Sequence, residues 1–456
     1  MNKNAMRLGL SLLLLAGLAG CQPPRAESET YELLFCADGA VYSALLASNN
    51  GVTLNKLLDL PPDSTCPIWS RDGKLALLYR FKQAGLTVED SLSLIERQSG
   101  IIKEVYHFEP RDAEWTIRWL PDGISFLIAS ARDYHGVEGC SKLFTQRSFN
   151  GTDCWSGYAD LYSMDVRLQD APDHFERLTD SPSPRCDLTW SSDGRKVVYS
   201  RGDICKEGVG NSSSIEILSR ETSVTLPLVD GTSGTADPSA VNLNSAPQWS
   251  PNGEEVSFTR FQSASGSPPT HQLLIANVAS SGTHPISPDA VYGYWSPDGK
   301  KIVWWRDNFE TLGVTDLESS DTQTWSLSKD RVYIMSPLGW SPNGQYFAWT
   351  ERGEGGNEKA VRILDLASAN LTTLSTSFAH SVAWSWDSNW LAFSVRTPIE
   401  PNTCKHRIEI YIVKPDGTGL RNVTDGQQRS ALPCGPTGWG WKWYQDTISD
   451  VQWVSR

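Results

Sequence analysis

A motif built on one tryptophan recurs seven times along this chain of 456 residues. Its most regular copy, at Trp295, reads Trp-Ser-Pro-Asp-Gly and is followed by an alternating apolar run. Successive motif tryptophans are 50, 71, 59, 46, 45 and 44 residues apart, and they are Trp69, Trp119, Trp190, Trp249, Trp295, Trp340 and Trp384. A period near 45 residues is typical of a four-stranded propeller blade. The chain is therefore predicted to be an all-β protein with a β-propeller fold.

Each repeat carries the local signals of a small antiparallel sheet. Apolar residues leading into the tryptophan predict a first strand, and Ser-Pro-Asp-Gly places Pro second and Gly fourth in a type I turn. The alternating run at 301–305 then predicts a hairpin partner. Third and fourth strands are expected at positions such as 272–276 and 422–424. Some turns are less regular, because Leu120 replaces Ser, Arg71 and Ser192 replace Pro, and 386–389 lacks both Pro and Gly.

The composition agrees with this fold and argues against other classes. Hydrophobic residues make up 39% of the chain, and 19 Trp, 36 Gly and 26 Pro supply core anchors and turns. The formal net charge of −13 argues against nucleic-acid binding, because neutralising phosphates requires a basic surface.

The repeats resemble the Pro-Asp-type propeller repeat of the TolB-like family, which also occurs in the propeller domains of prolyl-oligopeptidase-type enzymes. The resemblance covers residues 31–456 and implies a propeller, while saying little about function. The peptidase activity of the enzymes does not carry over, because the sequence has no Gly-x-Ser-x-Gly nucleophile motif and the repeats leave no chain for a hydrolase domain.

The two ends of the chain predict one further blade. Residues 450–455 repeat the strand pattern that leads into Trp384 and then stop, whereas strand-like segments at 31–35, 40–46 and 52–60 have no leading Trp strand. One C-terminal strand and three N-terminal strands would complete a blade and leave no exposed sheet edges. We therefore expect eight blades with Trp453 as the eighth anchor; seven blades are the alternative.

The beginning of the chain has the features of an export signal. Lys3 and Arg7 precede an apolar run over 8–19, which is shorter than the ~20 residues that span a bilayer. The run ends in Leu-Ala-Gly before Cys21 and resembles the lipobox of bacterial lipoproteins. We expect a signal peptide over 1–20, a lipidated Cys21, a tether over 21–30 and one propeller domain over 31–456. An ordinary secretory signal is the alternative. The expected location is extracytoplasmic, with the membrane contacted through the lipid anchor only.

Eight cysteines remain once Cys21 is assigned to the lipid, and an even number in an exported protein suggests disulfides. Many pairings are possible. Sequential pairing keeps every bridge within or next to one blade, and it joins Cys36 to Cys66, Cys140 to Cys154, Cys186 to Cys205 and Cys404 to Cys434. None of these cysteines has the close spacing of a zinc site, so no metal and no cofactor are expected.

An arginine recurs eleven to thirteen residues after each motif tryptophan. The seven residues are Arg80, Arg132, Arg201, Arg260, Arg306, Arg352 and Arg396. Each is expected to end the second strand, so that the seven could ring one mouth of the propeller and attract an anionic partner. The competing interpretation is that each arginine braces its own hairpin or pairs with a local acid such as Asp203, Asp307 or Glu354.

Two classes of function follow. The first is a lipid-tethered binding or scaffolding module that presents one face to an envelope protein, a peptide or an anionic glycan. The second is a stand-alone propeller enzyme, such as a polysaccharide lyase or glycosidase working in the channel. The missing nucleophile motif and seven scattered histidines favour binding, so we expect no enzyme and assign no catalytic residue.

Overall fold

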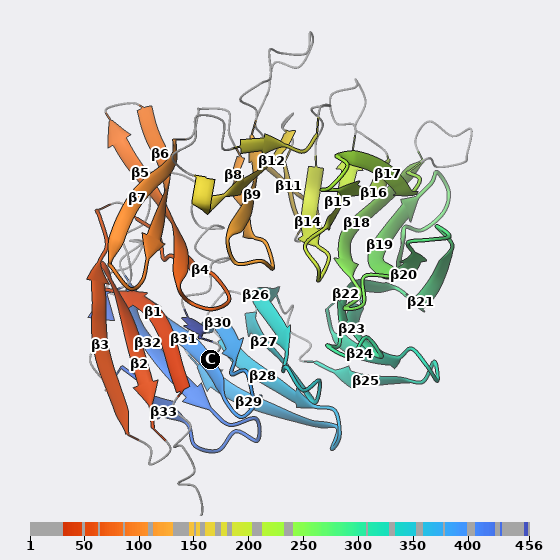
Figure 1. Ribbon diagram of the computed structural model, residues 1–456. Coiled ribbons are helices and arrows are strands. Elements are labelled where there is room, and N and C mark those ends of the chain that lie inside the picture. The colour runs from red at the N-terminus through yellow and green to blue at the C-terminus, as the bar shows by residue number, and fades with distance from the viewer. Residues whose placement is uncertain are drawn as a thin grey trace, which may run out of the picture.

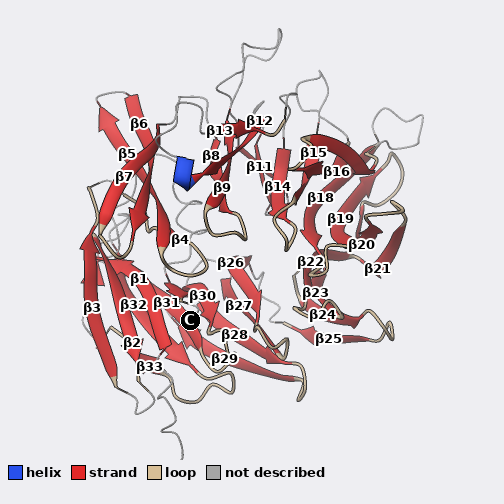
Figure 2. Cartoon of the chain, viewed as in Figure 1, coloured by secondary structure: helices blue, strands red, loops and turns tan. Residues whose placement is uncertain are grey.

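The computed structural model describes residues 31–47, 51–62, 64–84, 87–107, 113–130, 146–149, 152–155, 160–168, 175–179, 185–202, 212–231, 240–306, 309–327, 333–352, 359–376, 379–398, 406–424, 429–430 and 451–454. Within them the protein is an all-β propeller of eight blades, each built on four antiparallel strands (Figure 1). A single turn of 3-10 helix, η1 (Val166–Leu168), is the one helical element in this part of the chain (Figure 2).

We number the blades from the N-terminus and give the strands of each in the order of the repeat. Blades 1 and 2 are built from β35 (Val451–Trp453), β1 (Tyr31–Ala37), β2 (Ala40–Leu46) and β3 (Val52–Asp59), and from β4 (Ile68–Trp69), β5 (Leu75–Ala84), β6 (Thr87–Glu96) and β7 (Ile101–His107). Blades 3 and 4 are built from β8 (Ala113–Trp119), β9 (Ser125–Ser130), β12 (Asp160–Asp165) and β13 (Phe175–Arg177), and from β14 (Arg185–Trp190), β15 (Lys196–Gly202), β16 (Ser213–Ser219) and β17 (Val224–Val229).

The remaining four blades follow the repeat without interruption. Blades 5 and 6 are built from β18 (Val241–Trp249), β19 (Glu255–Ser263), β20 (Thr270–Asn277) and β21 (Thr283–Pro288), and from β22 (Ala290–Trp295), β23 (Lys301–Arg306), β24 (Thr311–Asp316) and β25 (Thr322–Ser326). Blades 7 and 8 are built from β26 (Tyr333–Trp340), β27 (Tyr346–Arg352), β28 (Lys359–Asp365) and β29 (Asn370–Thr376), and from β30 (Ala379–Trp384), β31 (Leu391–Pro398), β32 (His406–Val413) and β33 (Arg421–Asn422). A short strand, β34 (Arg429–Ser430), also pairs with β32.

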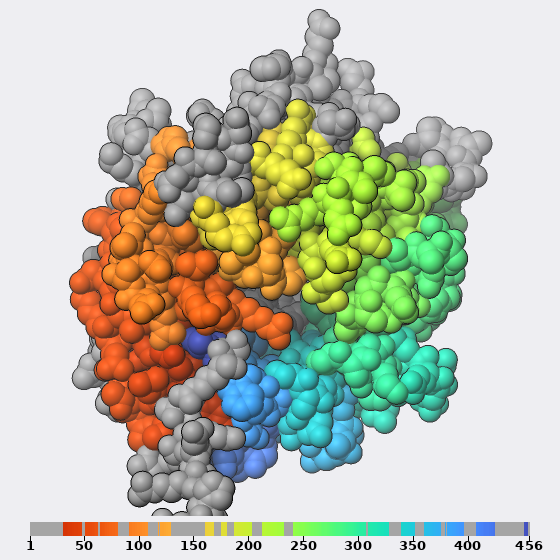
Figure 3. Space-filling view, viewed as in Figure 1, coloured from red at the N-terminus to blue at the C-terminus, as the bar shows by residue number. Residues whose placement is uncertain are grey.

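The C-terminal strand completes blade 1, as the sequence predicted. β35 pairs antiparallel with β1, with Trp453 opposite Leu33 and Val451 opposite Phe35. Figure 3 shows the dark-blue C-terminal residues lying against the red N-terminal strands. Val451 and Trp453 are buried in a cluster that also contains Ile410 of blade 8. The eight-blade prediction is therefore confirmed, with Trp453 as the eighth anchor.

The motif turn has the predicted form and is held by its own serine and aspartate. In blade 2 the backbone N–H of Gly73 donates to the carbonyl oxygen of Ser70 at 2.9 Å. The Ser70 hydroxyl donates to Asp72 and accepts from the backbone N–H of Leu75. Gly73 has a φ of 66°, a left-handed conformation that favours glycine. Asp72 therefore stabilises the motif turn.

The motif tryptophans join neighbouring blades. In six blades the indole nitrogen donates to the carbonyl oxygen of the residue just before the motif tryptophan of the preceding blade, over 2.7–3.2 Å; the donors are Trp119, Trp249, Trp295, Trp340, Trp384 and Trp453. The indole nitrogen of Trp190 is buried without such a partner. One residue type at one position therefore packs in the core and, in six of the eight blades, also fixes the blade against its neighbour.

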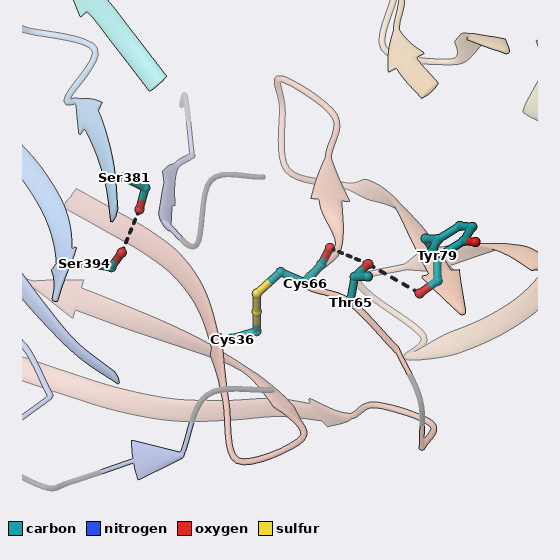
Figure 4. The surroundings of a disulfide bond; sticks show 6 residues. All are labelled: Cys36, Thr65, Cys66, Tyr79, Ser381 and Ser394. Carbon is teal, nitrogen blue, oxygen red and sulfur yellow. Dashed lines mark hydrogen bonds between the residues drawn. A yellow bond between two sulfur atoms is a disulfide. The ribbon is translucent and has the colours of Figure 1, made fainter. Parts of the chain in front are cut away.

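Two connections depart from the simple repeat. The long polar insertion between β9 and β12 contains a hairpin, β10 (Gln146–Phe149) and β11 (Thr152–Trp155), which extends the sheet of blade 4 at β14. The other is a covalent link between blades 1 and 2. Cys36 in β1 is bonded to Cys66, which lies just before β4, with their Cα atoms 5.8 Å apart (Figure 4). The predicted Cys36–Cys66 pair is confirmed.

Candidate functional site

The second strand of each blade runs from one face of the ring to the other. It starts at the motif turn and runs toward the opposite face, where the recurring arginines were expected to gather. The motif turns of successive blades lie side by side: a Cβ atom added at Gly194 would meet Pro121 at 3.0 Å, and one at Gly344 would meet Pro297 at 3.6 Å. We call this side the turn face. Positions below are counted from the motif tryptophan of each blade.

The recurring arginines do not all share one position of the repeat. Arg80, Arg201, Arg260 and Arg306 stand at position +11, whereas Arg352 and Arg396 stand at +12 and Arg132 lies outside the described residues. Consecutive residues of a strand take opposite faces of the sheet. Position +11 is held by Glu351 in blade 7 and by Val395 in blade 8.

The expectation that each arginine ends the second strand holds only in part. β23 ends at Arg306 and β27 at Arg352, but β5 continues four residues beyond Arg80, and β19 three beyond Arg260. β31 likewise continues past Arg396 to Pro398. The strands in these blades are longer than the motif suggested, because their hairpin pairing continues beyond the repeat unit.

Local partners hold two of the four +11 arginines. Arg201 forms an ion pair with Glu216 at 3.1 Å, and Arg260 donates from Nε to Asn244 at 3.0 Å and lies over the Phe258 ring. Burial lowers the pKa of the Arg260 guanidinium. Arg306 is exposed. The acids suggested as local partners, Asp203, Asp307 and Glu354, lie outside the described residues.

A pocket of about 450 Å³ opens on the turn face where blades 7, 8 and 1 meet. Its volume is within the range of small-molecule sites. Three aromatic residues and several amides and hydroxyls contribute to its wall. The lining residues are Tyr31, Asn343, Gln345, Tyr346, Ser388, Asn389, Trp390, Lys414, Pro415 and Asp416.

Neighbouring contacts hold the aromatic part of the pocket in place. The Tyr31 hydroxyl donates to Asp387 at 2.6 Å, and the Tyr31 ring stacks on Trp386, which is 47% exposed. The Tyr346 ring stacks on Trp384 with centroids 5.7 Å apart. The Lys414 ammonium lies 5.9 Å from the centre of the Trp390 ring. The aromatic walls are therefore largely fixed before any ligand arrives.

The two charged residues in the pocket wall carry opposite charges. Asp416 accepts hydrogen bonds from the hydroxyl and the backbone N–H of Thr418, which hold the pKa of this carboxyl below its ordinary value. Burial raises the pKa of the Tyr346 phenol, with the charges of Asp365 and Asp416 adding to the effect. The wall therefore contains one side chain of each charge, Lys414 and Asp416.

The sequence carried a signal for this pocket that the motif alignment did not use. Position +5 is charged in four blades, as Lys74, Arg195, Glu254 and Lys300, but it is an amide in blades 7 and 8, as Gln345 and Asn389. Position +6 is Leu75, Ser125, Lys196, Glu255 and Lys301 in blades 2 to 6, but it is aromatic in blades 7 and 8. Two adjacent blades thus change the same two positions together.

Tyr31 extends this pattern into blade 1. Leu33 pairs with Trp453 as Leu391 pairs with Trp384, so Leu33 holds position +7 of blade 1. Tyr31 therefore holds position +5, beside the corresponding amide of blade 8. β1 consequently begins on the turn face.

Several other predicted site residues are not placed. Cys21, Cys140, Cys205, Cys404 and Cys434 lie outside the described residues. In the backbone register of β11 and β14, Cys154 stands opposite Cys186, an arrangement that the sequential pairing did not anticipate. Among the described residues no three His, Cys, Asp or Glu side chains form a group that could hold a metal ion. The same part of the chain contains no helix able to cross a membrane.

Comparison with known proteins gives a likeness of fold. No protein-family model matches the chain, and no curated protein matches it either. Among solved structures, TolB from Acinetobacter baumannii is 16% identical with a TM-score of 0.39, over 84% of this chain and 83% of that one. An oligogalacturonate lyase in complex with manganese is 10% identical with a TM-score of 0.47, over 79% and 85%. A eukaryotic initiation factor is 14% identical with a TM-score of 0.49, over 89% and 92%.

The class of the protein follows from its own topology. Eight antiparallel blades, a ring closed by β35 and a tryptophan contact between blades define a β-propeller.

Proposed function

We propose that the protein is a lipid-anchored, extracytoplasmic propeller that acts as a binding or scaffolding module of the cell envelope and is not an enzyme. The observation that carries this proposal is the pocket on the turn face. Its wall is built from aromatic rings, amides and hydroxyls of three consecutive blades, which is the composition of a site that holds a ligand.

The chemistry of the pocket favours binding over catalysis. Asp416 is the one carboxylate among the lining residues, and there is no histidine among them. Glycoside hydrolysis ordinarily requires two carboxyl groups, one of them protonated. The hydrogen bonds from Thr418 keep Asp416 ionised, so this residue is poorly suited to donate a proton as a general acid.

The predicted anchor and the pocket fit one orientation. Nine residues lie between the acylated Cys21 and Tyr31 in this proposal, and the ten steps from Cys21 to Tyr31 reach at most ~36 Å when fully extended. Because β1 begins on the turn face, a tether of this length would keep that face and its pocket near the membrane, with the +11 arginines on the far side. The pocket can then take a ligand at the membrane side, and the far face remains open to an envelope protein, a peptide or an anionic glycan.

Fractionation and binding together test the proposal. Cys21→Ser is expected to release the protein from membranes, since it removes the lipid site. The released protein is expected to bind saturably to washed envelopes of the cells that make it. Continued membrane retention of an intact Cys21→Ser protein would disprove the lipid anchor, and absence of saturable envelope binding would disprove the binding role.

A further inference from the structure

We propose that the pocket between blades 7, 8 and 1 binds a neutral saccharide. This inference rests on the binding role proposed above and assigns a site and a ligand class to it. The arguments come from the aromatic walls, the amides between them, and the balance of charge.

The aromatic residues provide flat apolar surfaces for a sugar ring. Tyr346 and Trp390 occupy the same position of adjacent blades, and the largely buried Tyr31 also lines the pocket. The Trp390 ring already has the Lys414 ammonium and the Arg421 guanidinium over it, 5.9 and 5.0 Å from its centre. The faces of aromatic rings are electron-rich, and the C–H bonds on one side of a pyranose ring are weakly positive. A pyranose can therefore lie against the half-buried Tyr346 ring, while its hydroxyl groups meet the polar side chains of the wall.

Amides on the rim provide both donors and acceptors for hydroxyl groups. Gln345 accepts a hydrogen bond from Asn343 at 3.2 Å through Oε1, and its Nε2 makes no hydrogen bond to the described residues. Asn389 donates from Nδ2 to Asp387, and its Oδ1 makes none within the same part of the chain. One free donor and one free acceptor match the ability of a sugar hydroxyl to accept and to donate.

The balance of charge selects against ionic ligands. Lys414 and Asp416 lie on the same turn of blade 8 and have opposite charges. Other blades place charged side chains at position +5, but the two blades that form the pocket place amides there. An anionic glycan would meet the Asp416 carboxylate, and a cationic ligand would meet the Lys414 ammonium.

Calorimetric titration of the mature chain produced from Gln22 to Arg456, which carries neither the apolar signal segment nor the lipid site, tests the inference. The neutral probes are cellotetraose and N,N′,N″,N‴-tetraacetylchitotetraose, and the comparison probes are tetragalacturonate and a neutral tetrapeptide. Phosphatidylcholine vesicles with and without diglucosyl diacylglycerol test a saccharide presented as a lipid headgroup. Saturable binding of a neutral tetrasaccharide or of the glycolipid vesicles is the expected result, and which of the two binds identifies the source of the saccharide.

Two substitutions and two matched controls assign the binding to the pocket. Tyr346→Leu removes one aromatic wall while restoring the residue type found at this position in blade 2, and it is expected to weaken binding roughly tenfold. Gln345→Ala removes a rim amide and is expected to weaken binding by about fivefold. Glu255→Leu and Glu254→Ala change the same positions in blade 5 and should leave binding unchanged.

Three results would overturn the inference: no binding of any neutral saccharide, equal binding by all four variants, or stronger binding of tetragalacturonate or the peptide. Gln345 is exposed, so its variant remains informative if Tyr346→Leu does not fold. Retention of saturable envelope binding in any of these cases would leave the proposed binding role intact and reject only the saccharide pocket.

Discussion

The indole nitrogen of Trp453 donates a 2.8 Å hydrogen bond to the backbone carbonyl of Ala383, seventy residues earlier in the chain. This contact joins blade 1 to blade 8 and repeats the contact that links five other pairs of neighbouring blades. The last strand of the protein thus closes the ring by the same tryptophan hydrogen bond that holds much of the ring together. Closure also brings Tyr31 beside blades 7 and 8 and so completes the pocket.

The hydrogen bond can be tested apart from the packing of the ring. Trp453→Phe keeps an aromatic side chain in place but removes the donor, and we expect the free energy of unfolding to fall by about 1 kcal/mol or more. Trp190→Phe is the matched control, because the Trp190 indole nitrogen is buried without a partner and its removal should cost less. Equal losses for the two variants in urea unfolding would argue against a stabilising role for the hydrogen bond.

The Cys36–Cys66 bond closes a loop of 30 residues between blades 1 and 2. In the chain-entropy description a loop of this length stabilises the folded protein by roughly 3 to 4 kcal/mol. Urea unfolding with and without reductant, together with a Cys36→Ala/Cys66→Ala variant, measures this contribution. The urea midpoint of the variant should be lower than that of the oxidised wild type, and reductant should lower the midpoint of the variant less than that of the wild type. Equal midpoints for the variant and the oxidised wild type would contradict the assignment.

Acid should destabilise the protein through its hydrogen-bonded carboxylates. The Lys301 ammonium donates to Asp316 at 2.6 Å, and this contact lowers the pKa of Asp316 to about 2 from its ordinary 3.8. Because the pKa is lower in the folded state, the stabilisation is present above pH ~4 and is lost as the pH falls from 3.8 toward 2.

Asp316→Asn isolates this effect, since the amide oxygen can still accept from the backbone N–H groups of Glu318 and Ser319. The variant should be less stable than the wild type at pH 6, and the difference should vanish near pH 2. A difference in the free energy of unfolding that is the same at pH 6 and at pH 2 would contradict the assignment.

Two arginines at the same register should behave differently. Arg201 pairs with Glu216, whose side chain is 10% exposed, so Arg201→Gln leaves a nearly buried carboxylate without its cation. We expect a loss of about 1 to 2 kcal/mol, moderated by the solvent exposure of Arg201. Arg306 is exposed, and Arg306→Gln should change stability by less than about 0.5 kcal/mol. A larger loss of stability in Arg306→Gln than in Arg201→Gln, measured by thermal or urea unfolding, would contradict this assignment.

Most of the fold could be predicted because the same strand and turn signals recur in blade after blade. The period, the serine-aspartate turn and the strand pattern around Trp453 are local signals, and closure follows from the need to cover the edges of an open sheet. The hydrogen bonds from the tryptophans to the preceding blade could not be read in the same way, because they depend on how blades pack and not on spacing within a blade.

The functional positions were harder to predict because they depend on strand register. A difference of one residue separates Arg306 at +11 from Arg352 at +12, and alternation within a strand turns that difference into opposite faces of a sheet. The pocket could not be predicted from the residues that recur, because its lining side chains do not belong to the repeat. Gln345, Tyr346, Asn389 and Trp390 are informative because they depart from the repeat.

Closure by β35 is the feature on which both the ring and the pocket depend. Deleting residues 449–456 removes Val451 and Trp453, whose burial contributes about 3 to 6 kcal/mol, and leaves β1 with an unpaired edge. Deleting only 455–456, which follow the strand, is the control. Comparison of the three proteins by thermal unfolding should place the long truncation far below the other two, and an intact melting temperature in the 449–456 deletion would contradict the closed eight-bladed ring.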